Sequence, residues 1–477
     1  MKRVALLSLI LAGCTTVGPD YREPQMAVPA SYLEPGASGT AQLDHWWRGF
    51  DDPQLAGLVE LALNQNLDIE MAAARIREAR ALERAAGAGA SPQVGAETSV
   101  TRQRISENAI PAPPGSGGGA PGGGTGFGLP GQEFTTFRAG FDASWELDLF
   151  GRNRREREAA AARTGAAVWN RRDVEVAVAA EVAGAYLRLR TLQARIANSE
   201  AELARQQRFE QLVGARARGG LVTGQDLEQQ RSERSAAAAA IPALEAQAKA
   251  EIHALGVLTG QTPDSLAKQL AAPGIMPPSP VVPPGLPSDL LRRRPDIRSA
   301  ERELAAATAD IGVAVADLYP RISLTAAPAL VSTALGSLLA WGSRSFSIGA
   351  ALDWPIFDGG RRRATIEVRN ARQEQAMIAY RKAVLIALQD VEESLGRIDG
   401  DRRQLAELER ARATAARAEE IARTRYRGGL VTLSDVLQAQ QRRLSLEEQV
   451  IETRGALARD TVALVKALGG GWQENQR

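Results

Sequence analysis

The 477-residue chain has little cysteine and histidine, few aromatic residues, and no surplus of either charge. A single cysteine excludes an internal disulfide, and two distant histidines, His45 and His253, argue against a zinc site built on Cys and His. The 58 Lys and Arg residues nearly cancel the 56 Asp and Glu residues, so the basic surplus of nucleic-acid binders is missing. No apolar run reaches about 18 residues, so no transmembrane helix is expected. We predict no metal site and no nucleic-acid partner.

Catalytic motifs are also missing. The sequence contains no serine elbow, no histidine pair spaced for a metal and no P-loop. A Gly117-x-Gly119-x-x-Gly122 pattern contains Pro121 and has no βαβ unit around it, which argues against a dinucleotide site. We predict no catalytic residues and no enzymatic activity.

The N-terminus has the pattern of a bacterial export signal. Lys2 and Arg3 precede an apolar stretch over 4–12, which is too short to span a bilayer. The stretch ends in Leu-Ala-Gly-Cys14, which resembles a lipobox. That resemblance implies a lipoprotein signal peptide over 1–13, a covalent lipid on Cys14 as the only cofactor, and, because Thr15 follows, sorting to the outer membrane. The alternative is an ordinary secretory signal with an incidental cysteine.

The chain repeats itself. The segment Arg218–Thr223 recurs as Arg427–Thr432, 209 positions later, and Gly140 and Trp145 recur at the same offset as Gly349 and Trp354. A proline-rich stretch separates the two copies and reads as a semi-rigid linker. We predict an N-terminal anchor and linker segment, a first repeat, a Pro-rich linker, a second repeat and a tail, with boundaries at 14–52, 53–260, 261–287, 288–470 and 471–477.

Each repeat contains a segment that predicts a very long helix. No proline occurs from Arg152 to about Ala217, or from Arg361 to Arg427. A helix of that length is roughly 100 Å long at 1.5 Å per residue. Helices this long with few aromatic residues usually pack side by side as coiled coils.

Each repeat also contains two segments in which apolar and polar residues alternate. They predict strands at about 92–102 and 134–149, and at about 320–330 and 344–355. This pattern fits a barrel strand with one lipid face and one wet face. Two soluble hairpins packed on a helix layer are the alternative. Four strands are too few for a membrane barrel, so the barrel interpretation requires several chains.

Several segments resemble outer-membrane efflux lipoproteins of the OprM/NodT type, relatives of TolC. These segments are 46–55, 74–80, 141–152, 293–298 and 318–320. The resemblance implies a mainly α fold with a membrane β-barrel: two structural repeats, each with a β-hairpin and long helices, in a homotrimer with a 12-strand barrel and a periplasmic α-helical tunnel. It further implies a passive outer-membrane exit duct for small molecules such as drugs. Its expected partners are a periplasmic adaptor (membrane fusion protein) and an inner-membrane RND-type transporter.

The repeated Gly-Gly segments predict two helix–turn–helix tips, with Thr223 and Thr432 as N-caps and Asp226 and Asp435 three residues on. By resemblance, the tips contact the adaptor through Gly219, Gly220, Leu221, Thr223, Gly428, Gly429, Leu430 and Thr432. Candidates for the periplasmic entrance are Asp226, Asp435, Gln438 and Arg442. Related channels often have an acidic residue where Gln438 stands. Arg442 or Arg443 paired with Asp435 of another chain would hold the entrance shut, whereas helix capping alone is the structural alternative for both aspartates.

Other interpretations remain at this point. A protein-secretion duct resembling TolC and a pore-free periplasmic coiled-coil lipoprotein both fit the long helices. Trp145 and Trp354 fit either an interfacial aromatic belt or a core at the joint of strand and helix. In the barrel interpretation, the Gly/Pro-rich loop over 111–131 is extracellular.

Overall fold

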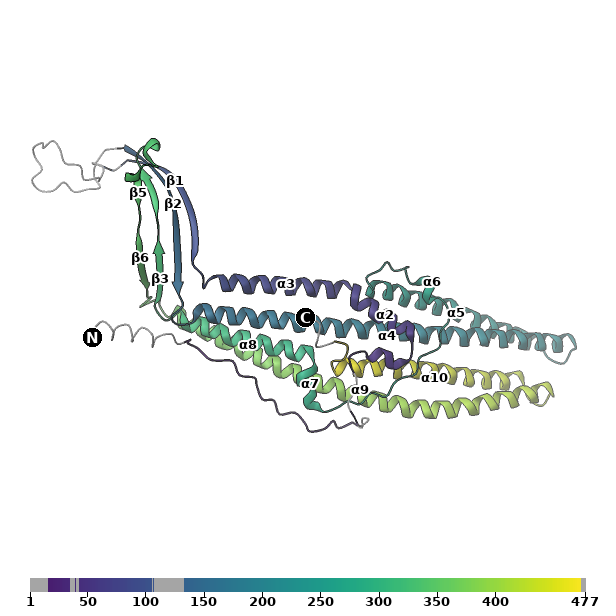
Figure 1. Cartoon of the computed structure of the whole chain (residues 1–477). Helices are drawn as coiled ribbons and strands as arrows, with labels where there is room; N and C mark the ends of the chain where they lie inside the picture. The colour runs from purple at the N-terminus through teal and green to yellow at the C-terminus, as the bar shows by residue number, and fades with distance from the viewer. Residues whose placement is uncertain (1–15, 35–38, 40–42, 105, 107–132, 473–477) are drawn as a thin grey trace, which may run out of the picture. The chain divides into compact units, whose positions relative to one another are not determined.

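The computed structural model describes residues 16–34, 39, 43–104, 106 and 133–472. The predicted lipid site at Cys14 and the loop over 111–131 therefore lie outside the described residues. Unit 1 comprises Met1–Arg22, Arg80–Ala162 and Ala305–Glu374, and unit 2 comprises Glu23–Ala79, Arg163–Leu304 and Gln375–Arg477. Figure 1 labels the helices and strands of both.

Long helices dominate the chain (Figure 1). Helices α4 (Arg152–Arg218) and α9 (Arg361–Arg427) each have 67 residues, and α5 (Gly224–Leu258) and α10 (Leu433–Ala467) each have 35. The matched lengths confirm the predicted mainly α fold with two repeats. Among the described helices, none combines the length and the apolar composition needed to cross a bilayer.

Unit 1 contains an antiparallel sheet. Its strands are β1 (Gln93–Arg104), β2 (Glu133–Leu147), β3 (Arg321–Ala326), β4 (Ala329–Ser332), β5 (Arg344–Ser345) and β6 (Ile348–Asp353). Strand β2 pairs with β1 on one side and with β3 and β4 on the other, and these pair in turn with β6 and β5. Among the described strands, β1, β5 and β6 therefore form the unpaired edges of a sheet four strands wide.

The register gives this sheet an apolar face and a polar face. Directly opposed residues point to the same side of a sheet. Phe137, Phe141 and Trp145 of β2 lie opposite Val100, Ala96 and Leu324, and Leu324 lies opposite Ala350 of β6. The alternate residues of β1 and β2 carry the other face: Gly95, Glu97, Ser99, Arg138, Gly140, Asp142, Ser144 and Glu146. The alternation in the sequence thus becomes a two-faced sheet.

The second hairpin differs from its predicted form. The single strand expected over 320–330 is two strands, β3 and β4, interrupted at Ala327 and Pro328. Proline has no N–H to contribute to a ladder. The Pro328 carbonyl instead accepts a hydrogen bond from the Phe141 N–H (2.9 Å). The strand expected over 344–355 is likewise divided into β5 and β6 and ends at Asp353, with the 3₁₀ turns Leu335–Ser337 and Trp341–Ser343 between the two halves of the hairpin.

Trp145 and Trp354 hold equivalent positions at the strand–helix joint, the part of unit 1 where β2, β3 and β6 meet the helices. The Trp145 indole N–H donates to the Ala90 carbonyl (3.0 Å), and that of Trp354 donates to the Leu318 carbonyl (3.3 Å). Each acceptor lies two residues after a helix: α3 (Leu67–Ala88) or α8 (Pro295–Ala316). Each indole therefore satisfies a backbone carbonyl just beyond a helix end. Trp145 and Trp354 are 38% and 58% exposed, so within the chain they lie at the joint but not in a core.

Unit 2 contains the main hydrophobic core. Short elements, namely η1 (Trp46–Phe50), α2 (Pro53–Gln65), α6 (Ala267–Leu270) and α7 (Pro287–Arg293), pack with parts of the long helices. Trp47, Phe50 and Tyr186 are almost fully buried. The Tyr186 hydroxyl donates to Asp52 (2.7 Å), and Asp52 also caps α2. Burial, followed by this hydrogen bond to a carboxylate, raises the pKa of Tyr186.

Candidate functional site: the helical tips and the ion cluster behind them

The two Gly-Gly turns have the same geometry. Helix α4 ends at Arg218, and the Leu221 N–H donates back to the Arg216 carbonyl (2.9 Å). Helix α9 ends at Arg427, and the Leu430 N–H donates to the Arg425 carbonyl (2.9 Å). The second glycine of each turn has a positive φ, +68° and +74°, which only glycine adopts at no steric cost.

The residues after each turn start the next helix through a capping box. The Asp226 N–H donates to the Thr223 hydroxyl (3.2 Å), and the Thr223 N–H donates to the Asp226 carboxylate (2.9 Å). Thr432 and Asp435 repeat both bonds, at 3.3 and 2.8 Å. The hydrogen bonds from Thr432 lower the pKa of Asp435. Each aspartate thus has a capping role within its own chain, and its role at an entrance remains a prediction.

The two tips contact one another within unit 2. Phe209 and Val213 of α4 pack with Tyr426, Leu433, Val436 and Leu437 in a small apolar cluster. The Arg216 guanidinium donates to the Tyr426 carbonyl (2.7 Å) and lies over the Tyr426 ring, 4.9 Å from its centroid. Leu221 and Leu430 remain 69% and 76% exposed. The apolar cluster and Arg216 therefore hold the two tips together, and each tip exposes one leucine to solvent.

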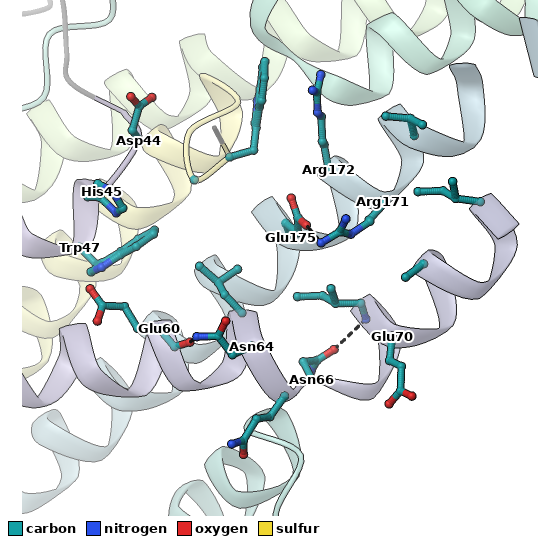
Figure 2. A pocket seen from close by; sticks show the side chains of 18 of the residues that line it. Asp44, His45, Trp47, Glu60, Asn64, Asn66, Glu70, Arg171, Arg172 and Glu175 are labelled. Atoms are coloured by element: carbon teal, nitrogen blue, oxygen red, sulfur yellow. Dashed lines mark hydrogen bonds and ion pairs between the residues drawn. The ribbon is translucent and has the colours of Figure 1, made fainter. Parts of the chain in front are cut away.

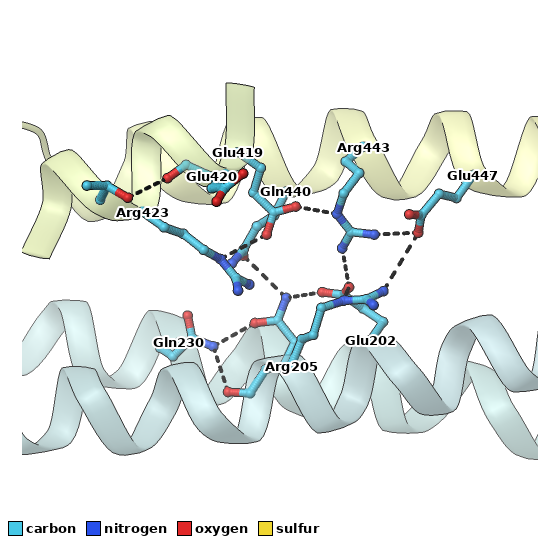
Figure 3. Close-up of polar contacts among 11 residues, drawn as sticks. Glu202, Arg205, Gln230, Glu419, Glu420, Arg423, Gln440, Arg443 and Glu447 are labelled. Atoms are coloured by element: carbon cyan, nitrogen blue, oxygen red, sulfur yellow. Dashed lines mark hydrogen bonds and ion pairs between the residues drawn. The ribbon is translucent and has the colours of Figure 1, made fainter. Parts of the chain in front are cut away.

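A buried ion cluster lies behind the tips (Figure 3). Arg443 of α10 forms ion pairs with Glu202 of α4, Glu419 of α9 and Glu447 of α10. The side chains of Arg443, Glu202 and Glu419 are only 6%, 3% and 6% exposed. Arg205 also donates to Glu202 (2.9 Å). The cluster therefore fastens a helix of the first repeat to the helical hairpin of the second.

The charges in this cluster stabilise one another. Burial opposes ionisation of both partners, but Glu202 and Glu419 raise the pKa of Arg443, and bonds from Arg205 and the charge of Arg443 lower the pKa of Glu202. In Arg423, burial outweighs the nearby carboxylates and lowers the pKa. A buried pair of this kind is costly to break, because the remaining charge loses its partner.

The structure separates two arginines that are adjacent in sequence. Arg442 and Gln438 are exposed, whereas Arg443 is buried in its own chain's ion cluster. The expectation that Arg443 pairs with Asp435 of another chain is wrong, because its guanidinium already binds three carboxylates. Arg442, one residue away and about 100° around the helix, is exposed and stays an entrance candidate.

The sequence did contain a signal for this missed cluster. Glu419 and Arg443 stand 209 positions after Glu210 and Arg234, and that earlier pair also lies close together (3.4 Å). A charge pair kept across an internal repeat indicates contact between the two helices of a tip. Glu202 carried no such signal, because its repeat partner at 411 is alanine.

A second polar region, also in unit 2, surrounds a cavity of about 600 Å³ (Figure 2). Its wall includes Trp47 and Arg48 of η1, Asn66 of the α2–α3 junction, and Arg171 and Glu175 of α4. The wall charges pair with one another: Arg48 binds Glu60 (2.8 Å) and Arg171 binds Glu175 (3.0 Å). Asn66 caps α3 through the Ile69 N–H (3.2 Å). These contacts are structural. Among the described residues, no group of three His, Cys, Asp or Glu side chains is placed to hold a metal.

Comparison with known proteins agrees with this architecture. The family model for "Outer membrane efflux protein" matches residues 58–261 and 286–470. The chain is 34% identical to the pyoverdine export outer membrane protein OpmQ of Pseudomonas aeruginosa, over 100% of this chain and 98% of OpmQ. It is 30% identical to the probable outer membrane lipoprotein SilC of Salmonella typhimurium, over 99% and 100%.

A solved structure shows the same fold. The outer-membrane channel OprN superposes with a TM-score of 0.86 at 33% identity, covering 96% of this chain and 99% of OprN. The fold predicted from the resemblance is therefore confirmed, and so are the location in the outer membrane and the absence of an enzymatic role. This chain belongs to the outer membrane efflux protein family, whose members are outer-membrane channels and not enzymes.

Proposed function

We propose that this chain is the passive exit duct of a tripartite efflux system and exports small molecules. The observation that carries the proposal is the sheet of unit 1, which has one apolar face, one polar face and two unpaired edges. An apolar face suits lipid and a polar face suits a water-filled channel. The name of the relative OpmQ, a pyoverdine exporter, supports a small-molecule cargo.

The length of the sheet fits the thickness of a membrane. Strand β1 has 12 residues. At about 3.4 Å per residue and a tilt of about 40°, such a strand spans roughly 30 Å, the thickness of the hydrocarbon core. The apolar residues Val94, Ala96 and Val100 lie in the first eight residues of β1, and Arg102 and Arg104 follow on the same face towards its end.

The edges of the sheet favour assembly. Open edges are not tolerated in lipid, because their backbone groups find no hydrogen-bond partners there. Pairing β1 of one copy with β6 of the next joins antiparallel strands and removes both edges. Three copies make a 12-strand barrel, an even number within the known range. The resemblance to OprM and TolC supports the same homotrimer, with the long helices forming a periplasmic tunnel.

The remaining parts have matching roles in this proposal. A lipid on Cys14 anchors the chain to the outer membrane, as the lipobox pattern and the name of the relative SilC suggest. The tips, with exposed Leu221 and Leu430, meet a periplasmic adaptor, and an inner-membrane RND-type transporter supplies the energy. Asp226, Asp435, Gln438 and Arg442 are the proposed entrance residues.

The test is conductance in planar bilayers, on protein extracted from outer membranes with its oligomer mass determined. We expect a trimer with small conductance that increases in Asp435→Asn or Arg442→Gln. Asn keeps a side-chain oxygen for the helix cap but removes the charge, so it separates gating from capping better than Ala does. A monomer without conductance would refute the duct. Unchanged conductance in both variants would remove these residues from the entrance.

A further inference from the structure

Four arginines at the strand–helix joint occupy positions where helix electrostatics disfavours a cation. Helices α4 and α9 begin with arginines and have no acidic residue in their first turn. The positive end of a helix dipole disfavours cations at this position. The carboxylates of Asp148 and Asp358, just before the two helices, accept hydrogen bonds from backbone N–H groups such as that of Arg154 (2.8 Å). The basic residues therefore need another explanation.

These arginines are exposed and without a carboxylate partner. Arg154 and Arg157 of α4, and Arg361 and Arg363 of α9, are exposed. Their neighbours Arg152, Arg155 and Arg362 form ion pairs, but no carboxylate among the described residues pairs with the four. Four guanidinium groups are thus available to an anion from outside the chain.

The register brings both arginine pairs to one rim of the sheet. Leu147 at the end of β2, Ile322 of β3 and Leu352 of β6 are register partners. Adjacent strands lie about 4.8 Å apart, so the ends of β2 and β6 are separated by roughly 10 Å at this rim. Helix α4 starts five residues after Leu147, and α9 starts eight residues after Asp353. All of these residues belong to unit 1.

The same rim carries exposed apolar side chains. Trp354, Ile356 and Phe357, between β6 and α9, are 58%, 90% and 92% exposed. Aromatic side chains gather where the hydrocarbon of a membrane meets its headgroups. Arg154 and Arg157 lie two and five residues into α4, which is about 3–8 Å from its first residue along the axis. A headgroup layer is about 5–7 Å thick, so these guanidinium groups fall within it.

The N-terminal segment adds an independent indication of the membrane level. The Val17 N–H donates to the Phe150 carbonyl (3.1 Å), and Arg154 donates to the Thr16 hydroxyl (2.8 Å). Buried Arg155 donates to the Val17 carbonyl (3.2 Å) and binds Asp20 (2.6 Å). Thr16 lies two residues after Cys14, the proposed lipid site, so these contacts hold at the joint the segment that follows the proposed anchor.

We propose that the exposed arginines Arg154, Arg157, Arg361 and Arg363 bind the phosphate groups of anionic phospholipids in the leaflet that the sheet enters. The proposal rests on the proposed membrane role of the sheet. Guanidinium groups bind phosphate through paired N–H donors, and the adjacent apolar side chains fit the acyl region of the same lipid. The strand–helix joint is thus a lipid-binding collar, defined by these four arginines with Trp354, Ile356 and Phe357.

The experiment counts bound lipid. Full-length acylated protein in neutral detergent is titrated with dioleoyl-phosphatidylglycerol or dioleoyl-phosphatidylcholine, and bound lipids are counted by native mass spectrometry. The joint variant carries Arg154→Gln, Arg157→Gln, Arg361→Gln and Arg363→Gln. The matched control removes four exposed arginines from the part of α9 that belongs to unit 2: Arg402→Gln, Arg403→Gln, Arg410→Gln and Arg417→Gln. Arg402 lies about 60 Å along the helix from its start at 1.5 Å per residue.

We expect the wild type and the control to prefer phosphatidylglycerol, and the joint variant to bind it at least about tenfold more weakly. A version with Lys at the four positions should keep the preference, because charge is retained. The proposal is overturned if the wild type binds both lipids equally, or if the joint variant keeps the preference for phosphatidylglycerol. It is also overturned if the control loses as much affinity for phosphatidylglycerol as the joint variant does. If the joint variant melts lower than the wild type, the single variants Arg157→Gln and Arg361→Gln are measured instead against Arg402→Gln, and equal affinities then overturn it.

Conductance separates this inference from the proposed function. A joint variant with wild-type conductance but weaker lipid binding supports both. A wild type that prefers phosphatidylglycerol but shows no conductance refutes the duct and leaves the collar standing. A conducting wild type without lipid preference refutes the collar alone.

Discussion

The two repeats carry the same charge pair in different surroundings. Glu210 and Arg234 in the first repeat are 20% and 43% exposed, whereas their counterparts Glu419 and Arg443, 209 positions later, are each 6% exposed. The difference is Glu202, which reaches the second pair from α4 and has no equivalent for the first. An internal repeat thus preserves the pairing of residues, while the neighbouring helix decides how much the pair contributes to stability.

The largest expected effect comes from breaking the buried pair. Arg443→Met removes the cation that Glu202 and Glu419 share and leaves them only Arg205 and Arg423. Removing one partner of a buried ion pair typically costs about 3–5 kcal/mol of unfolding free energy, and the two remaining arginines place the expected loss near the lower value. Arg234→Met, its counterpart, removes a partly exposed pair worth under about 1 kcal/mol. Denaturant unfolding of the two purified variants measures both values. Equal losses would show that the two pairs contribute alike despite their different burial.

Glycines at repeat-equivalent positions give a second contrast. A Cβ at Gly140 would lie 2.5 Å from the Ala329 side chain and 2.7 Å from the Pro328 carbonyl, but a Cβ at Gly349 would find its nearest neighbour, Thr325, at 3.8 Å. Gly140→Ala should therefore cost about 1–3 kcal/mol by overpacking, whereas Gly349→Ala should be nearly neutral. Thermal melting of the assembled protein tests both, and a neutral Gly140→Ala would mean that β4 moves away freely.

A third contrast concerns pH. Arg397 binds Asp460 (3.1 Å) just as Arg188 binds Glu251 (2.8 Å) in the first repeat, but Asp401 stands where the first repeat has Leu192. Burial and the neighbouring charge of Asp460 raise the pKa of Asp401 from 3.8 to about 6. One Asp401 oxygen is buried without a donor, and a shared proton would bridge the two carboxyls.

The raised pKa sets the sign of the pH effect. Between about pH 4 and 6 the folded state holds a proton that the unfolded state releases, so the stability from this group is present below pH 4 and is lost as pH rises through 6. Asp401→Asn should remove that loss of stability and raise the free energy of unfolding at pH 8 by about 1 kcal/mol, a value reduced to allow for solvent screening of a partly exposed group. Unfolding curves at pH 4 and pH 8 measure the difference. Asp399→Asn, which breaks an exposed pair with Arg403, is the control, and an equal gain there would contradict the assignment.

The smallest expected difference lies between the two tips. Asp226 and Asp435 make the same capping bonds, so Asp226→Ala and Asp435→Ala should lower the melting temperature by small and equal amounts. Bilayer conductance of the same pair sharpens the comparison. If only Asp435→Ala opens the channel, the tips differ in function although they agree in structure. Unequal melting temperatures would instead show that one capping bond is weaker than its geometry indicates.

Features that depend on short stretches of chain were readable from the sequence. The Gly-Gly turns, the Thr N-caps and the matched tryptophans follow from local rules for helix ends and strand ends, and the structure contains each of them. The interruption at Pro328 was not predicted, since it depends on how Gly140 of a distant strand admits Ala329. Proline alone allows such a break but does not require it.

The sequence alone determined the two-repeat plan, the long helices, the two-faced strands and the capped tips, because periodicity and end signals act within a few turns of chain. Only the tertiary structure decided which of two adjacent arginines is buried. Arg442 and Arg443 differ by one position, about 100° around a helix, and the recurrence of the Glu210–Arg234 pair as Glu419–Arg443 indicates a contact but not its burial. The difference arises from Glu202, 241 residues away, which meets Arg443 only after the two repeats have packed together.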